Sequence, residues 1–171
     1  MRLHLEGEQA QEGLGRRLAG LLAADWAGGW ILNLHGDLGA GKTTLVRGIL
    51  RGLGHVGAVK SPTYTLIEPY EPGGRAVFHL DLYRLGDPEE LEYLGLRDLL
   101  GGEGLLLVEW PERAGSALPR PDLEIRIAYA GAGRDLEILA LGDRGEALVR
   151  ALARTTDQGM RPELSLKGHG R

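Results

Sequence analysis

Hydrophobic and polar residues follow each other along the chain in patterns that predict alternating helices and strands. Apolar positions at helical spacing predict helices over residues 9–24 and 43–53. The continuous apolar runs at residues 30–34 and 105–108 are typical of strands that are buried on both faces of a parallel sheet. Segments rich in β-prone residues, bounded by turn signals, predict further strands at residues 2–6, 61–70, 76–82, 122–129 and 135–141.

Turn and capping residues indicate how these elements are joined. Glycine and proline around residues 71–75, and the glycine-containing turn at 130–134, predict two β-hairpins. Asp87 and Pro88 predict the start of another helix, because Asp caps a helix and Pro fits its first turn. That helix is expected to end near Leu100, before two glycines.

The carboxyl-terminal part of the chain is predicted to hold one more helix, over residues 145–154, and then a flexible polar tail at 155–171. No repeat or linker divides the sequence, so residues 1–154 are expected to form a single domain. The order of the elements predicts an α/β fold with three layers, in which a mainly parallel central sheet carries antiparallel additions.

Composition excludes several classes of function. With a net charge of −4, the chain lacks the basic surface that proteins coating nucleic acid use for phosphate contacts. It contains no cysteine, which excludes disulfides, thiolate catalysis and cysteine zinc sites. No apolar run approaches the roughly 20 residues that span a bilayer, and residues 1–7 lack the pattern of a signal peptide, so a cytoplasmic protein is expected.

Residues 36–43 match the phosphate-binding pattern G-x-x-x-x-G-K-[ST], and they lie between a predicted strand and a predicted helix. Glycines let the backbone curl so that N–H groups point at phosphate oxygens, and the positive end of the helix adds to their effect. Lys42 supplies a charge for the β- and γ-phosphates, and the Thr43 hydroxyl is a ligand for Mg²⁺. The sequence therefore predicts a P-loop NTPase-type domain that binds ATP with Mg²⁺. The predicted nucleotide-binding segment is Asp37, Leu38, Gly39, Ala40, Gly41, Lys42, Thr43 and Thr44.

Two acidic residues follow predicted strands, where a triphosphate site needs a carboxylate for Mg²⁺. Glu109 ends the buried run 105–108, and Asp81 follows the apolar residues 77–80. Either carboxylate is also explained as an ordinary residue at the end of a strand. Because Glu109 follows the cleaner buried strand, we expect Glu109 to hold the metal and Asp81 to orient or deprotonate the attacking water.

The segment Ser61-Pro62-Thr63-Tyr64-Thr65 lies between the phosphate-loop helix and the strand before Asp81. Nucleotide switches place a threonine hydroxyl in this position to sense the γ-phosphate, although the start of a strand rich in Thr and Tyr explains the same residues. Trp110 is either a core residue or an anchor for a partner. The guanine-specifying pattern Asn-Lys-x-Asp is absent, which favours ATP over GTP.

Four segments together resemble the TsaE family, the bacterial ATPases of tRNA threonylcarbamoyladenosine (t⁶A) biosynthesis. The resemblance extends over residues 5–135, and the helix start at 87–92 also fits the family pattern. The four segments are Gly36-Asp37-Leu38-Gly39-Ala40-Gly41-Lys42-Thr43-Thr44, Lys60-Ser61-Pro62-Thr63-Tyr64-Thr65, His79-Leu80-Asp81-Leu82-Tyr83-Arg84 and Val108-Glu109-Trp110-Pro111.

The resemblance implies an ATPase that acts with TsaB and TsaD to form t⁶A at position 37 of tRNAs that read ANN codons, and that meets tRNA only within the complex. In the family, TsaD carries out the transfer, while ATP hydrolysis resets or activates the complex. The resemblance assigns Lys42 to phosphate, Thr43 and Glu109 to Mg²⁺, and Asp81 and Thr63 to hydrolysis. It also places three residues at the rim of the nucleotide: Glu8, Glu112 and Gly133.

Two other functions share the phosphate loop. A small-molecule kinase needs an acceptor pocket and usually an arginine-rich lid, whereas the arginines after Leu100 are spread over predicted turns and strands. A non-hydrolysing binding module uses ATP only as a conformational switch. Because the sequence shows no obvious arginine finger in cis, we expect an ATPase that is slow alone and depends on partner proteins.

Overall fold

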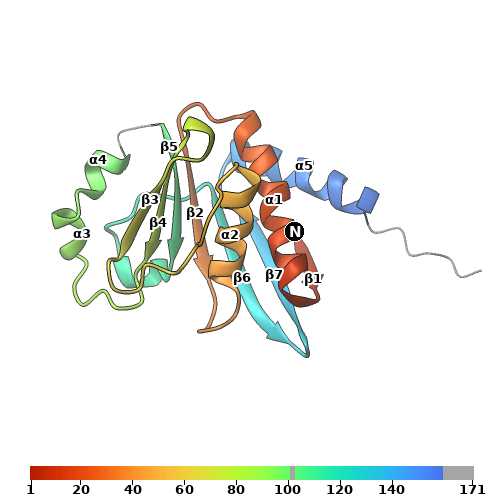
Figure 1. The fold of residues 1–171 in the computed structure, drawn as a ribbon, viewed down its shortest axis with the longest axis horizontal. Coiled ribbons are helices and arrows are strands. Elements are labelled where there is room, and N and C mark those ends of the chain that lie inside the picture. Colours follow the sequence, from red (N-terminus) through yellow and green to blue (C-terminus); the bar gives the residue numbers. More distant parts are fainter. Residues whose placement is uncertain (101–102, 160–171) are drawn as a thin grey trace, which may run out of the picture.

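A mixed sheet of seven strands runs through the computed structural model, which describes residues 1–100 and 103–159 (Figure 1). The strands are β1 (Arg2–Leu5), β2 (Trp30–His35), β3 (Ile67–Tyr70), β4 (Ala76–Asp81), β5 (Gly104–Glu109), β6 (Leu123–Ala130) and β7 (Gly133–Ala140). They lie in the order β1-β7-β6-β2-β5-β4-β3. Strand β2 is parallel to its neighbours β6 and β5, and β4 is parallel to β5. The pairs β1–β7, β6–β7 and β3–β4 are antiparallel, which confirms the predicted parallel centre with antiparallel additions.

Helices flank this sheet on both faces, which confirms the predicted three-layer α/β fold. The longer helices are α1 (Gly7–Ala24), α2 (Lys42–Gly52) and α5 (Asp143–Gly159). The shorter ones are α3 (Glu90–Tyr93) and α4 (Leu96–Leu100), and two 3₁₀ turns are η1 (Pro72–Gly74) and η2 (Pro111–Ala114). Figure 1 shows α1 and α2 packed side by side across one face, with α3 and α4 near the β3–β4 edge.

The larger hydrophobic core lies between the sheet and the longer helices. Leu18 of α1, Ile49 of α2 and Leu107 of β5 are fully buried in it. Helices α1 and α2 approach so closely that a Cβ atom on Gly15 would stand 2.6 Å from the Leu45 carbonyl oxygen. A glycine is therefore required at this crossing, which holds the helix that follows the phosphate loop against its neighbour.

A second, smaller core covers part of the opposite face. Leu80 of β4 and Val108 of β5 are fully buried there against Leu91 of α3 and Leu96 of α4. Because side chains alternate along a strand, the residues next to Leu80 and Val108 face the side of the sheet that carries α2. The two cores therefore fix which side chains of β4 and β5 point toward the phosphate loop.

The segment at residues 61–66 is not the strand that the sequence predicts, because β3 begins only at Ile67. The chain forms a closed turn instead, in which the Leu66 N–H donates to the Pro62 carbonyl at 2.8 Å and Leu66 has a positive φ of 64°. Hydroxyl groups of this segment bond to a carboxylate, an alternative that competes with pairing in a sheet.

The helix predicted over residues 87–100 is divided into α3 and α4. The Asp87 carboxylate accepts the Glu89 N–H at 2.9 Å, as expected of a capping residue. Gly95, between the two helices, has a φ of 72°, a left-handed conformation that ends a helix. The prediction of one continuous helix was wrong, because Gly95 in the middle of the segment takes the conformation of a helix terminus, whereas the predicted end at Leu100 is confirmed.

Helix α5 is longer than predicted, since it includes residues 155–159, which the sequence assigns to the tail. Leu148 and Leu152 are buried in the larger core, and the next position at this spacing is Thr156, which is buried too. The Thr156 hydroxyl donates to the Leu152 carbonyl at 2.9 Å, so a polar residue continues the buried stripe. The rest of the predicted tail, 160–171, lies outside the described residues.

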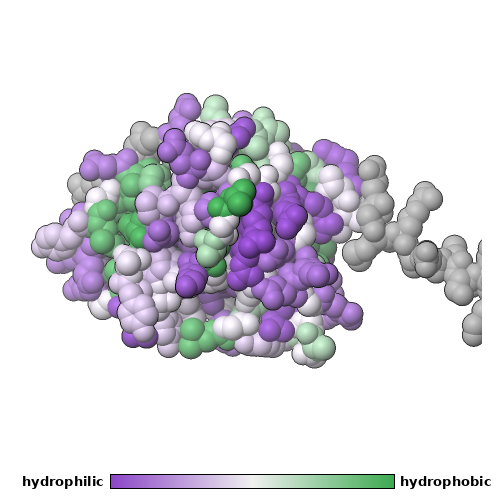
Figure 2. All heavy atoms as spheres, viewed as in Figure 1, coloured by the Kyte–Doolittle hydropathy of each residue, from purple (hydrophilic) through white to green (hydrophobic). Residues whose placement is uncertain are grey.

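The face that carries α1 and α2 is mainly hydrophilic, and its hydrophobic residues form small, separate groups (Figure 2). Among the residues whose burial the structure describes, the large hydrophobic side chains that are exposed are Leu38, Val56, Tyr64, Tyr93, Leu94 and Tyr129. Over residues 1–100 and 103–159, no helix has the length and apolar character that crossing a membrane requires.

Candidate functional site

The parallel strands β2, β5 and β4 bring the predicted site residues to one edge of the sheet. Leu34 of β2 lies beside Glu109 of β5, and Glu109 lies beside Asp81 of β4. The chain leaves β2 through the glycine loop and enters α2 at Lys42. In open α/β sheets, ligands bind beyond the carboxyl ends of the strands, at this kind of position.

Lys42 is folded back onto the loop that precedes it. Its ammonium group donates hydrogen bonds to the backbone carbonyl oxygens of Gly36 and, at 3.0 Å, Asp37. Gly41, with a φ of 110°, gives the backbone the turn that starts α2 at this point. Lys42 is only 4% exposed, and this burial lowers the pKa of its ammonium group, while nearby carboxylates oppose the shift. The ammonium nitrogen also lies 4.3 Å from the centre of the Trp110 ring.

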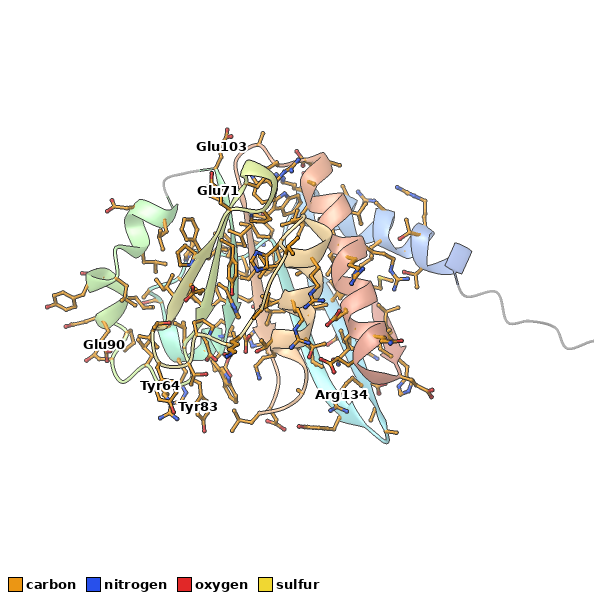
Figure 3. The ribbon with its side chains drawn as sticks, viewed as in Figure 1. Tyr64, Glu71, Tyr83, Glu90, Glu103 and Arg134 are labelled. Carbon is orange, nitrogen blue, oxygen red and sulfur yellow. The ribbon has the colours of Figure 1, made fainter. Side chains whose placement is uncertain are left out.

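Side chains from α1 and from the β6–β7 hairpin hold the outside of the loop. Gln11 of α1 and Arg134 of β7 both donate to the Ala40 carbonyl, at 3.2 and 3.0 Å. The Tyr129 hydroxyl donates to the Leu38 carbonyl at 2.6 Å, and the Arg134 guanidinium lies 4.2 Å from the Tyr129 ring centre. Figure 3 shows Arg134 at the end of the hairpin that lies beside the loop. These contacts fix the shape of the loop.

The Thr43 hydroxyl and the Glu109 carboxylate are in direct contact. Thr43 donates to Glu109 Oε1 at 2.8 Å, and His79 Nε2 lies 2.8 Å from the same oxygen. His79 is fully buried, and Glu109 is 3% exposed. Because an ionised carboxylate only accepts hydrogen bonds, the Nε2 atom of His79 carries the proton of this bond. His79 therefore holds Glu109 in place from the side of the core.

Asp81 connects two neighbouring segments at the mouth of the site. Its Oδ2 atom accepts hydrogen bonds from the hydroxyls of Ser61 and, at 3.2 Å, Thr63. Its Oδ1 atom accepts the Tyr83 N–H at 3.0 Å. The segment that the sequence marks as switch-like thus lies directly against the acid that we expect to act on water.

A cleft of about 540 Å³ opens between these groups. Its lining residues are Leu38, Gly39, Gly41, Lys42, Thr43, Thr44, Ser61, Thr63, Asp81, Tyr83, Arg84, Glu109 and Trp110. One wall offers glycine backbone and an ammonium group, which suit phosphate. The other offers a hydroxyl and two carboxylates, which suit Mg²⁺. In the described part of the chain, no group of three or more His, Cys, Asp or Glu residues could hold a metal ion.

Three residues expected at the rim of the nucleotide do not line this cleft. Glu8 forms an ion pair with Arg47 of α2, and Glu112 Oε2 lies 3.4 Å from His35 Nδ1. Gly133 begins β7 at the tip of the hairpin that braces the loop. Their role in nucleotide binding stays a prediction.

Sequence reasoning assigned no role to three residues that the structure brings to the site: Gln11, His79 and Arg84. Gln11 is a polar residue on the buried face of α1, which is a signal that sequence pattern alone can give. His79 and Arg84 lie in the segment around Asp81 that carries the family resemblance, but their spacing indicates no function. Two residues of the predicted segment, Asp37 and Ala40, contribute backbone carbonyls to the loop and do not line the cleft.

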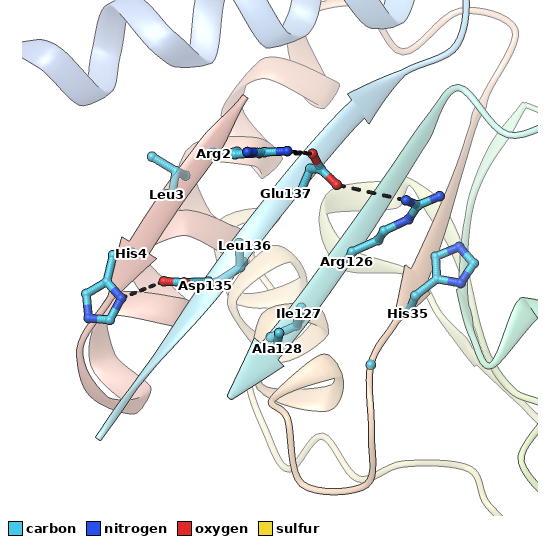
Figure 4. A pocket seen from close by; sticks show the side chains of 11 residues that line it. Arg2, Leu3, His4, His35, Arg126, Ile127, Ala128, Asp135, Leu136 and Glu137 are labelled. Atoms are coloured by element: carbon cyan, nitrogen blue, oxygen red, sulfur yellow. Dashed lines mark hydrogen bonds and ion pairs between the residues drawn. The ribbon is translucent and has the colours of Figure 1, made fainter. Parts of the chain in front are cut away.

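A second hollow, of about 670 Å³, lies on the open face of β1, β7, β6 and β2 (Figure 4). Arg2, Glu137 and Arg126 stand at paired positions on three neighbouring strands, with ion pairs of 3.1 and 3.9 Å. His4 and Asp135 form a further pair at 2.7 Å. The charged side chains of this hollow thus pair with one another.

Comparison with known proteins shows the family of the chain. The sequence profile of the family described as "Threonylcarbamoyl adenosine biosynthesis protein TsaE" matches residues 5–136. The chain is 48% identical over 120 residues to the tRNA threonylcarbamoyladenosine biosynthesis protein TsaE of Haemophilus influenzae, covering 70% of this chain and 76% of that protein. It is 42% identical over 140 residues to the protein of the same name from Bacillus subtilis, covering 81% and 87%. The crystal structure of Bacillus subtilis YdiB matches the fold with a TM-score of 0.76 at 32% identity, covering 91% of this chain and 95% of that chain.

Proposed function

This chain belongs to the TsaE family, and on that premise we propose that it binds and hydrolyses ATP in the formation of t⁶A in tRNA, together with TsaB and TsaD. The observation that supports the proposal is that three features line one cleft: the loop around Lys42, the Thr43–Glu109 contact and the Asp81 carboxylate. The proposed site of action is the cytoplasm, and the chain reaches tRNA through its partners.

In this proposal, the glycine loop and the start of α2 bind the phosphates. Lys42 and the backbone N–H groups of residues 39–43 bind the oxygens of the β- and γ-phosphates. Thr43 and Glu109 hold Mg²⁺, which, when bound, neutralises negative charge on the phosphates. His79 keeps the Glu109 carboxylate oriented through the bond at 2.8 Å.

In the same proposal, Asp81 and its neighbours promote the hydrolysis of ATP. A water oxygen forms a bond to the γ-phosphorus while the bond from phosphorus to the bridging oxygen breaks, and ADP leaves with that electron pair. The Asp81 carboxylate accepts one proton of the water, or orients the water through the same contact. The hydroxyls of Ser61 and Thr63 fix the direction of this carboxylate.

The two rival functions are less well supported by the cleft. A kinase of small molecules usually closes an arginine-rich lid over its phosphates. Within the described residues, Arg84 is the single arginine among those that line the cleft. A binding module without hydrolysis needs no acid for the water, whereas Asp81 is buried and directed by three hydrogen bonds at the cleft.

The proposal is tested by measuring phosphate release from ATP with TsaB, TsaD and tRNA present. Lys42→Ala removes the charge that faces the phosphates and is expected to reduce hydrolysis at least a hundredfold, roughly the effect of losing one transition-state contact of this kind. The control is Arg51→Ala, which removes an exposed positive charge from the end of the same helix. Equal hydrolysis by the Lys42→Ala and Arg51→Ala proteins would contradict the proposal, and transfer of phosphate to a small-molecule acceptor would support the kinase.

A further inference from the structure

Arg84 stands on a rigid turn at the mouth of the phosphate cleft, which it lines. Leu82 and Leu85 on either side are buried in the smaller core, and the Leu85 N–H donates to the Leu82 carbonyl at 3.1 Å. Asp81 accepts the Tyr83 N–H, which ties the start of the turn to the site. The backbone of Arg84 is therefore fixed, while its side chain is exposed.

The Arg84 guanidinium rests on the ring of Tyr64, with its central carbon 4.7 Å from the ring centre. Within residues 1–100 and 103–159, it makes no ion pair and no hydrogen bond. Arg134 and Arg144, in contrast, donate to backbone carbonyls at several points, and Arg47 is held by two carboxylates. Arg84 is thus an arginine at the cleft whose donors are all available.

Tyr64 is presented by the turn that replaces the predicted strand. Its side chain is 84% exposed, so the ring is not part of the core. The base of the turn is fixed by the Leu66–Pro62 bond and by the hydroxyls of Ser61 and Thr63 on Asp81. Figure 3 shows Tyr64 and Tyr83 together at the end of the β3–β4 pair, where the cleft opens. The ring therefore offers Arg84 a fixed resting place just outside the cleft.

The balance of charge in the cleft favours a second positively charged side chain at the phosphates. Lys42 and Arg84 are the positively charged residues among its lining, and Asp81 and Glu109 are the negatively charged ones. Lys42 is drawn into the loop by the carbonyls of Gly36 and Asp37. A triphosphate together with these two carboxylates carries more negative charge than Lys42 and the Mg²⁺ of the proposed site would balance, and the charge on the terminal phosphate is where an arginine contributes most to transfer.

Although the sequence shows no obvious arginine finger in cis, we propose that Arg84 is a catalytic arginine of this chain that binds the terminal phosphate of ATP. In this proposal the Arg84 guanidinium leaves the Tyr64 ring when ATP binds. This inference rests on the proposed function, because it assigns a further residue to the same cleft. Binding of ATP then competes with the stacked state, so Tyr64 and Arg84 are energetically coupled. ADP lacks the terminal phosphate and does not draw Arg84 from the ring.

Displacement of a fluorescent ATP analogue by unlabelled ATP and ADP, with Mg²⁺ present, tests this role without any turnover. Arg84→Ala is expected to weaken ATP binding at least fivefold and to change ADP binding less than twofold. Arg84→Lys keeps the charge but loses the planar fork, so its ATP affinity is expected between those of wild type and Arg84→Ala. The control is Arg75→Ala, which removes a similar contact, with Trp26 at 5.6 Å, away from the cleft.

The energetic coupling between Tyr64 and Arg84 is measured by introducing Tyr64→Ala into the wild-type protein and into the Arg84→Ala protein. In the wild-type background this change is expected to strengthen ATP binding about two- to fivefold, the factor that an exposed cation–π contact represents. In the Arg84→Ala background it is expected to have no effect.

Three results would overturn parts of the account separately. If Arg84→Ala leaves the ratio of ATP to ADP affinity unchanged, Arg84 does not bind the terminal phosphate. If Tyr64→Ala changes ATP affinity equally in the wild-type and Arg84→Ala proteins, the contact between Arg84 and Tyr64 does not compete with ATP binding. Failure of the wild-type protein to bind ATP at all would instead remove the proposed function itself.

Discussion

The Thr43 hydroxyl donates a hydrogen bond of 2.8 Å to the Glu109 carboxylate, across 66 positions of sequence. Thr43 lies in the first turn of α2 and Glu109 ends β5, so this contact joins the glycine loop to the edge of the sheet. Asp81, beside Glu109 in the sheet, bonds instead to Ser61 and Thr63. The two carboxylates belong to different groups of contacts, and substitutions are expected to separate their roles.

Glu109→Gln is expected to raise the Mg²⁺ concentration needed for ATP binding at least tenfold, because a charged ligand of the metal becomes neutral while its size is kept. Asp81→Asn is expected to bind MgATP within about twofold of wild type and to lose hydrolysis at least a hundredfold, because the group that acts on water is neutral. Calorimetry of MgATP binding and phosphate release measure the two effects. If Asp81→Asn loses Mg²⁺-dependent affinity and Glu109→Gln keeps it, the two assignments are exchanged.

The crossing of α1 and α2 makes a prediction about stability. In Gly15→Ala, the new Cβ would stand 2.6 Å from the Leu45 carbonyl oxygen and 2.7 Å from the Ile49 nitrogen, so the helices must separate. We expect a loss of about 1–3 kcal/mol in the free energy of unfolding in urea. Gly13→Ala in the same helix is the matched control, because nothing lies within 4 Å of its Cβ position. That control is expected to be neutral or to gain up to about 1 kcal/mol from helix propensity, and equal effects of both changes would contradict the predicted packing.

The pH dependence of Lys42 follows from its burial, which lowers the pKa of its ammonium group. As pH rises, Lys42 is expected to lose its proton below the ordinary range of a lysine side chain, and ATP affinity should fall over the same range. Burial of the charged form costs stability below the lowered pKa, and this cost is relieved as pH rises toward the ordinary pKa of lysine. Because phosphate favours the charged form, addition of ATP should move the titration of Lys42 to higher pH.

Nuclear magnetic resonance of the lysine side chains measures this directly, since the chain holds three lysines, at positions 42, 60 and 167. Lys42→Arg assigns the signal. Titration of Lys42 at or above the ordinary pKa of lysine in the protein without nucleotide would contradict the effect of burial.

The main parts of the fold were predictable because they follow from local patterns. The apolar run that ends at Glu109 and the glycine loop before Lys42 each specify a strand end and a helix start within a few residues. Parallel strands then place their carboxyl ends at one edge, so the meeting of Glu109 and Asp81 with the loop also followed.

The features that were not predictable depend on contacts between distant segments. The turn that ends at Leu66 exists because hydroxyls of residues 61–63 bond to Asp81, and the β-prone sequence gives no sign of that carboxylate. The burial of Thr156 depends on the packing of α5, which lets a polar residue extend a helix beyond its apolar stripe. The contact of His79 with Glu109 likewise requires knowing which strands are neighbours.

Repeated rounds of t⁶A formation provide the most direct test that ATP hydrolysis in this cleft serves tRNA modification. TsaB, TsaD and excess tRNA are combined with the wild-type chain, with Lys42→Ala or with Arg51→Ala, and modified tRNA is counted together with released phosphate. The account predicts that wild type and Arg51→Ala modify many tRNA molecules per complex, whereas Lys42→Ala stops after about one round and releases phosphate only at background rate. Equal multiple-turnover modification with the Lys42→Ala protein would contradict the proposed role, whatever the affinity of the cleft for ATP.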